Sequence, residues 1–336
     1  MMKLGLQTLQ FLNDRARPYA DQLDEFLPVA RAADAGGLDW LSASEHWMSA
    51  PTVWGSQIPL LSRLAPEVPR MELMTQMLLL PLHNPVHVAE QLATLDQISR
   101  GRVVLGAAIG YRPSELEAAG ITRADRVSRL REGLEVIKQL WSGAAVSHEG
   151  RWWNVSGEMG FTPYRQPHPP VVLAAQSEAA TRRAARIADG VFFGPHATFD
   201  DLAALGSTYR EALAAEQRTE GRIGAGRAVF VGASRDEAVR AAQESVQRSV
   251  NMYGGWDMQE AGMIDLLSGD DSREWAVAGT TGDCVETLHR LNDEFGLDGV
   301  TLTIYNLPAD ADGRLEYVQR LAEEVVAPVK RLTNGD

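Results

Sequence analysis

The chain has 336 residues, of which 45% are hydrophobic and 23% are charged, and its formal net charge at pH 7 is −13. This acidic balance argues against nucleic acid and anionic membranes as partners, because both carry charge of the same sign. A single cysteine, Cys284, excludes an internal disulfide framework, and the first residues hold no apolar run long enough for a signal peptide or a membrane span. We therefore expect a cytoplasmic protein, and since no linker divides the sequence, residues 1–336 are expected to form a single domain.

Eight short apolar segments recur along the chain, and most of them are followed by a helix with one apolar face. Gly36-Gly37 is a typical stop for the first helix, and Asn84-Pro85 supplies a cap and a first-turn proline to a later one. Ser114 and Glu117 have the spacing of a capping box. The predicted strands are residues 3–8, 38–43, 71–80, 102–108, 170–175, 190–194, 227–232 and 299–304.

Strands that alternate with helices favour a parallel sheet, and eight such units indicate an α/β fold of the TIM (β/α)8 barrel type. The chain is longer than the ~250 residues typical of that fold, which leaves room for long βα-loop insertions. An open doubly wound sheet is the alternative, but no Gly-x-Gly-x-x-Gly follows the first strand. Three segments are predicted insertions: 45–70, 142–169 and 249–277. Their tryptophans suit either a pocket lid or contacts between subunits: Trp47, Trp54, Trp152, Trp153, Trp256 and Trp275.

Polar residues follow the second and third predicted strands, at the end of the barrel where catalytic groups are expected. His46 is able to exchange a proton at neutral pH, and the structural alternative is a histidine held by its neighbour Glu45. His83 and His87 are four residues apart, but Asn84-Pro85 starts a helix between them, so we do not expect a metal pair. No other cluster in the sequence has convincing metal-ligand spacing.

The fifth predicted strand leads into Ser177, which opens a helix. A serine at this position caps the helix, and the free N–H groups of a helix start also bind anions such as phosphate. The charge of Glu178 opposes a phosphate unless its side chain points to solvent. A cap alone and a cap with a phosphate site both fit these residues.

Taken in order, these motifs resemble the bacterial-luciferase-like flavin oxidoreductases, a TIM-barrel family that uses reduced flavin or the deazaflavin F420. The resemblance covers nearly the whole chain. It rests on Glu45-His46, on residues 81–86, 89–96, 99–102 and 106–110, on the turn at Ser177, and on Arg126, Arg129 and Leu140-Trp141.

The resemblance implies that the flavin ring lies across the carboxyl ends of strands three to five and that His46 is the active-site histidine. Gln76-Met77 falls where family members place a non-prolyl cis peptide under the ring. Ala108 and Tyr111 would border the ring. The phosphate would meet backbone N–H groups of three residues at a helix start: Gln176, Ser177 and Glu178.

This chain departs from bacterial luciferase at two positions: the first departure removes a phosphate partner, and the second implies a different substrate. Luciferase carries an arginine at the position of Ile109, where it meets the phosphate, and a second histidine at the position of Trp47. Members that use F420 tend to carry a tryptophan four residues beyond the histidine and a glutamate just past the glycine loop. Because this chain has Ala50 and Tyr111 at those positions, we favour FMN over F420.

The resemblance therefore implies a flavin-dependent monooxygenase that uses reduced FMN and O₂ to oxygenate a small organic substrate. A separate flavin reductase would supply the reduced FMN, and we expect a homodimer. Two alternatives stay open. One is an F420-dependent oxidoreductase, which transfers a hydride and needs no oxygen, and the other is a non-catalytic flavin-binding protein.

Overall fold

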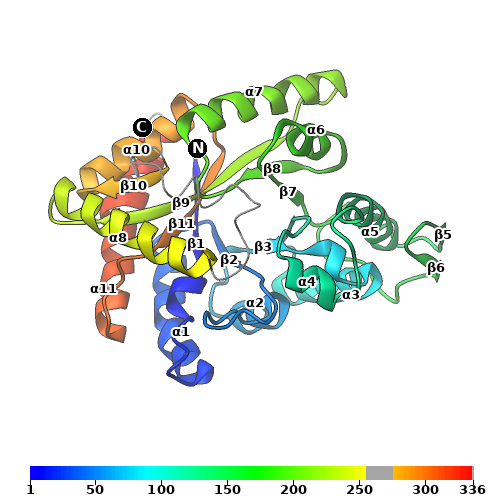
Figure 1. The fold of residues 1–336 in the computed structure, drawn as a ribbon, viewed down its shortest axis with the longest axis horizontal. Coiled ribbons are helices and arrows are strands. Elements are labelled where there is room, and N and C mark those ends of the chain that lie inside the picture. The colour runs from blue at the N-terminus through cyan, green and yellow to red at the C-terminus, as the bar shows by residue number, and fades with distance from the viewer. Residues whose placement is uncertain (255–274, 335–336) are drawn as a thin grey trace.

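The computed structural model describes residues 1–254 and 275–334. Eight parallel strands form a closed barrel inside a layer of helices (Figure 1), which confirms the predicted TIM barrel. Around the barrel the strands are β1 (Lys3–Gln7), β2 (Trp40–Ala43), β3 (Glu72–Leu78), β4 (Val103–Ala107), β7 (Val171–Ala175), β8 (Gly190–Phe193), β9 (Arg222–Val231) and β11 (Gly299–Ile304). The pairing of β8 with β9 closes the ring.

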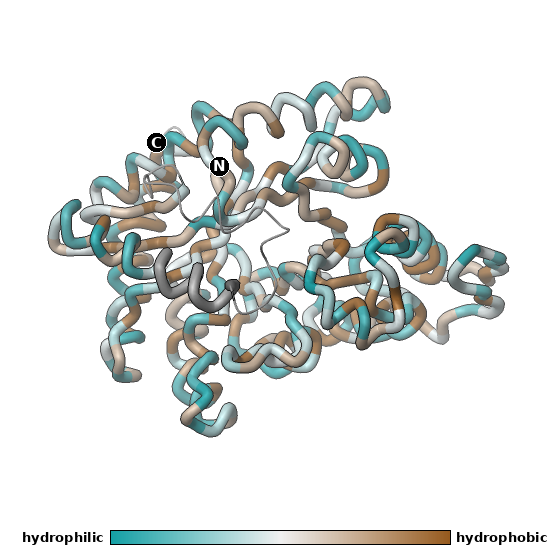
Figure 2. The backbone as a smooth tube through the Cα atoms, viewed as in Figure 1, coloured by the Kyte–Doolittle hydropathy of each residue, from teal (hydrophilic) through white to brown (hydrophobic). Residues whose placement is uncertain are grey.

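Each surrounding helix contains both hydrophobic and hydrophilic residues (Figure 2), as expected for helices that cover a barrel on one face and meet solvent on the other. They are α1 (Tyr19–Ala35), α2 (Gln57–Leu64), α3 (Pro85–Ser99), α4 (Pro113–Ala118), α5 (Arg126–Trp141), α6 (Glu178–Ile187), α7 (Phe199–Ala215), α8 (Arg235–Gly254), α10 (Thr281–Asp293), α11 (Ala311–Leu321) and α12 (Ala327–Asn334). In the described ranges, none of the helices has the length and apolar character needed to cross a membrane.

Local end signals explain where several helices begin and stop. α1 ends before Gly36, and Gly37 has a φ of +84°, as a glycine stop requires. The Asn84 side chain caps α3. The capping box predicted at Ser114 was wrong: α4 begins at Pro113, because a proline is preorganised for the first helical position.

Three strands were not predicted. β5 (Val146–Glu149) and β6 (Asn154–Gly157) form an antiparallel hairpin beside α5 at the edge of the molecule (Figure 1), inside the predicted loop 142–169. β10 (Ala276–Gly279) pairs with the second half of β9, beyond the part of β9 that pairs with β8. In the predicted loop 249–277, residues 255–274 lie outside the described residues, and Trp256 lies among them.

The interior of the barrel changes character along its axis. Alternate strand residues point inward, and one interior layer is large and apolar: Trp40, Met74, Val104, Val172 and Phe192. Glycine makes room for this layer, since a Cβ on Gly5 would lie 2.1 Å from the Trp40 indole. Two residues further along the same strands the positions are small or polar: Ser42, Gln76, Gly106, Ala174 and Gly194. The interior layer nearer the carboxyl ends of the strands therefore holds smaller side chains than the apolar layer.

Candidate active site

His46 lies just beyond β2, and both nitrogens of its ring have a partner. Nδ1 lies 2.8 Å from Glu115 Oε1, and Nε2 lies 3.0 Å from the Tyr111 hydroxyl. The Trp54 ring packs edge-on against the imidazole with a centroid distance of 4.9 Å. The structural alternative, in which Glu45 holds His46, was therefore wrong. The imidazole bonds to Glu115 and Tyr111, which both follow β4.

Glu115 is the residue of this site that the sequence analysis missed. It lies on α4 and is 1% exposed. Its Oε1 also accepts the Trp47 backbone N–H at 2.9 Å and lies 3.7 Å from Arg112 Nη1. Arg112 in turn donates to the Trp47 carbonyl oxygen at 2.7 Å. These contacts tie α4 to the loop after β2.

Glu45 faces a different loop from its neighbour His46. His83 Nε2 lies 2.9 Å from Glu45 Oε1, the Trp47 indole N–H donates to the same oxygen at 3.1 Å, and the Leu79 N–H donates to Oε2 at 2.8 Å. Burial raises the pKa of Glu45, but these hydrogen bonds outweigh burial and hold the pKa below its usual value. Glu45 is therefore the carboxylate that joins the loop after β2 to the end of β3.

Glu45→Gln is expected to destabilise the folded protein by roughly 1–3 kcal/mol at neutral pH, because an amide cannot accept all three hydrogen bonds. Since the pKa of Glu45 is lowered on folding, its stabilisation is present above the unfolded pKa and is lost as the pH falls through the folded one. The difference in Tm between the two proteins should shrink below about pH 4. Thermal unfolding from neutral pH to about pH 3 checks this, with the exposed Glu117→Gln as control. A difference that stays constant with pH would contradict it.

The peptide bond between Gln76 and Met77 is cis, at the position that the family resemblance indicates. The register of the β3–β4 ladder shifts here, between Thr75 and Leu78. The Gln57 side chain donates to the Met77 carbonyl oxygen at 3.0 Å. On the facing strand, a Cβ on Gly106 would lie 2.1 Å from the Thr75 carbonyl oxygen, so only glycine allows this close approach of β3 and β4.

The side chain of Gln76 is oriented from inside the barrel. The Trp40 indole N–H donates to Thr301 Oγ1 at 2.9 Å, and the Thr301 hydroxyl donates to Gln76 Oε1 at 2.7 Å. Because Oε1 accepts this bond, the amide group of Gln76 has a defined orientation, with its two donors on the opposite side. Thr301 thereby links Trp40 in the apolar layer to Gln76 in the interior layer nearer the carboxyl ends of the strands.

α6 starts directly after β7, with Ser177 as its cap. The serine hydroxyl accepts the Ala180 N–H at 3.4 Å. Gln176, Ser177 and Glu178 are all exposed. An exposed helix start presents backbone N–H groups to solvent, and these groups together with the helix dipole suit an anion.

All the predicted site residues lie at the carboxyl ends of four neighbouring strands, β2, β3, β4 and β7. Ala108, one residue past β4, packs against the cluster of Leu79, Leu82 and Leu116. His46 and Tyr111 are in direct contact. Within residues 1–254 and 275–334, no group of three or more His, Cys, Asp or Glu side chains could hold a metal ion.

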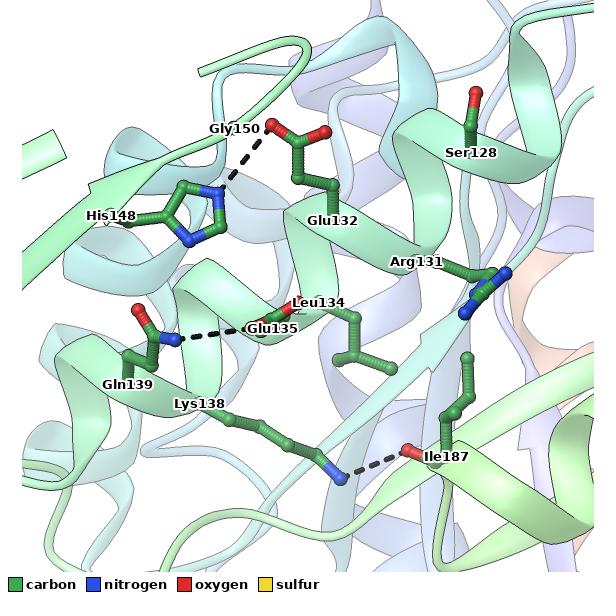
Figure 3. A pocket seen from close by; sticks show the side chains of 10 residues that line it. All are labelled: Ser128, Arg131, Glu132, Leu134, Glu135, Lys138, Gln139, His148, Gly150 and Ile187. Atoms are coloured by element: carbon green, nitrogen blue, oxygen red, sulfur yellow. Dashed lines mark hydrogen bonds and ion pairs between the residues drawn. The ribbon is translucent and has the colours of Figure 1, made fainter. Parts of the chain in front are cut away.

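A cleft of about 680 Å³ lies away from these residues, between α5, the end of α6 and the β5–β6 hairpin (Figure 3). Glu132 points toward His148, with 3.5 Å between Oε1 and Nε2. Lys138 points the other way and donates to the Ile187 carbonyl oxygen at 3.0 Å. Two tryptophans of the predicted loop 142–169 bond to residues of the same helix: Trp152 and Trp153. None of the predicted site residues lines this cleft.

The model of one protein family, described as luciferase-like monooxygenase, matches residues 2–299. The chain belongs to this family, and the relatives named below include flavin-dependent and F420-dependent oxidoreductases. The resemblance inferred from the motifs is thus confirmed. Membership in the family does not by itself select one of the two cofactors.

Relatives of both kinds are similar to this chain. The F420-dependent glucose-6-phosphate dehydrogenase of Kineococcus radiotolerans is 33% identical over 218 residues, which cover 61% of this chain and 64% of that protein. The oxygenase component of the flavin-dependent trigonelline monooxygenase of Acinetobacter baylyi is 28% identical over 257 residues, 74% of this chain and 71% of the other. The fold matches monooxygenase RslO1 from Streptomyces bottropensis with a TM-score of 0.82 at 22% identity, over 97% of this chain and 99% of that one.

Proposed function

We propose that this chain is the oxygenase component of an FMN-dependent monooxygenase, which takes reduced FMN from a separate reductase and uses O₂ to oxygenate a small organic substrate. The observation that carries the choice of FMN is Tyr111. Its hydroxyl bonds to His46 Nε2 at 3.0 Å, at the position where members that use F420 tend to carry a glutamate. Ala50 stands where those members tend to carry a tryptophan.

The residues of the site fit a flat ring that carries a phosphate. Several interior positions at the carboxyl end are small, Gly106 and Ala174 among them, which suits a flat ring at the barrel mouth. The exposed start of α6 supplies N–H donors for the phosphate. Reduced FMN, when bound, supplies the electrons for oxygen chemistry. Met77 and Ala108 would orient its ring, Ser177 would hold its phosphate, and His46 would exchange a proton at Nε2.

The trigonelline relative is named as an oxygenase component, which supports a separate reductase for this chain as well. A second candidate function is F420-dependent hydride transfer, favoured by the 33% identity to a dehydrogenase that uses F420. Oxygen consumption distinguishes the two functions, because a monooxygenase consumes O₂ and hydride transfer with F420 does not.

Reduced FMN is expected to bind at least ~10-fold more tightly than F420, a difference of about 1.4 kcal/mol, because Ala50 and Tyr111 replace the residues typical of F420 members. Anaerobic fluorescence or calorimetric titrations of the purified protein measure both affinities. Micromolar F420 binding without measurable binding of reduced FMN would overturn the proposal. Oxygen uptake with reduced FMN that yields no oxygenated product from any organic substrate would favour a flavin carrier instead.

A further inference from the structure

We propose that Glu115 is a positioning residue that fixes the tautomer of His46, and that the Tyr111 hydroxyl is the catalytic group that passes protons between His46 and the bound ligand. The role of Glu115 follows from geometry alone. The role of Tyr111 rests on the proposed function. Together the three side chains form a relay that runs from a buried carboxylate on α4 to the carboxyl end of the barrel.

The tautomer follows from the other bonds of Glu115 Oε1. This oxygen accepts the Trp47 backbone N–H at 2.9 Å and faces Arg112 Nη1 at 3.7 Å, so Oε1 acts as a hydrogen-bond acceptor. His46 Nδ1, at 2.8 Å from the same oxygen, must then carry its hydrogen toward Glu115. A carboxylate that holds one ring nitrogen determines which nitrogen is left to act as the base.

In this tautomer the neutral His46 has no hydrogen on Nε2, so Nε2 accepts the hydroxyl hydrogen of Tyr111 at 3.0 Å. When the ligand releases a proton to the Tyr111 oxygen, the tyrosine's own hydrogen moves to Nε2. The imidazolium that forms lies beside the Glu115 carboxylate, and the reverse sequence returns the proton to the ligand. One proton enters, one proton is stored, and no electrons move.

The burial of Glu115 beside His46 fits the proposed positioning role. The side chain is 1% exposed, and its Oε2 has no hydrogen-bond partner in the described part of the chain. Burying a carboxyl group costs free energy, which the contacts of Oε1 with His46, Trp47 and Arg112 offset. When His46 takes up a proton, the imidazolium that forms keeps Glu115 as its partner at 2.8 Å.

Nitrogen-15 spectra of the histidine rings test the role of Glu115 in the protein without added cofactor, at alkaline pH, with His46→Gln used to assign the signals. The wild type is expected to show Nδ1–H and bare Nε2 at His46. Glu115→Gln should yield a mixture of both tautomers, since an amide is both donor and acceptor. Glu117→Gln, an exposed glutamate on the same helix, is the matched control and should change nothing. A wild-type protein with Nε2–H at His46 would overturn the proposal without any variant.

Turnover with reduced FMN tests the role of Tyr111. Tyr111→Phe should lower product formation by roughly 10²-fold, as expected for the loss of a proton-transfer group, and should keep the Nδ1–H tautomer. Glu115→Gln should lower it by roughly 10-fold or more. Full turnover in a folded Tyr111→Phe protein would overturn the role of Tyr111 and leave that of Glu115 standing. A wild type that fails to bind reduced FMN would instead refute the proposed function, and the tautomer result would still stand.

Discussion

Replacing His46 by alanine is expected to reduce the formation of oxygenated product by roughly 10²-fold or more, because the protein loses the group that stores and returns a proton. Binding of reduced FMN should change much less. The ring and phosphate contacts proposed for the cofactor come from β3, β4 and the start of α6, and His46 follows β2. Reduced flavin bound to the variant would still react with oxygen. More of that oxygen would be released as hydrogen peroxide, and less would reach the product.

Rapid mixing of the variant and reduced FMN with aerated buffer measures the peroxide yield and the product yield together. The His83→Ala variant is a useful comparison, since His83 bonds to Glu45 and lies outside the proposed relay. A folded His46→Ala protein that keeps both its turnover and its coupling of oxygen to product would show that His46 has only a structural role.

Placing a negative charge at the start of α6 is the change expected to affect cofactor affinity most. Ser177→Asp should weaken the binding of FMN by at least ~10-fold, since two like charges about 4 Å apart repel by roughly 1–4 kcal/mol at a protein surface. Riboflavin, which lacks the phosphate, should bind nearly as tightly as it does to the wild type. Aspartate is itself a good helix cap, so α6 should keep its start.

Parallel titrations with FMN and riboflavin separate the phosphate contact from damage to the helix. Ser177→Ala is the gentler control, because it removes the cap for about 1 kcal/mol and leaves the backbone N–H groups in place. An equal loss of affinity for both ligands in Ser177→Asp would refute a phosphate site at this helix start.

Local rules explain what the sequence could predict of the fold. All eight barrel strands contain apolar runs, and the caps at Asn84 and Ser177 depend only on residues next to them. The first half of β9 was missed because it is rich in glycine, which disfavours strands, although pairing with β8 and β11 holds it extended. The short β5, β6 and β10 gave no periodic signal.

The candidate site was predicted through its motifs and missed in its pairings. The structural alternative had Glu45 hold its neighbour His46, yet the two side chains project toward different elements. Glu115 could not be found from spacing, because it meets His46 across 69 positions of the chain. It lies in the first turn of α4, which starts at Pro113 and not at the predicted capping box. Contacts of this kind are set by tertiary packing, which a motif does not encode.

The opposite orientations of Glu45 and His46 have a consequence for engineering the protein. Glu45 bonds to Leu79 and His83 at the end of β3, and His46 bonds to Glu115 on the helix after β4. The dipeptide thus joins the βα units of β2, β3 and β4 into one block. The hydrogen bonds of Glu45 and His46 described above all come from the first four strands and the segments that follow them. Loop grafting after β8 and β11 thus offers a route to new substrate scope that spares the groups proposed to handle protons.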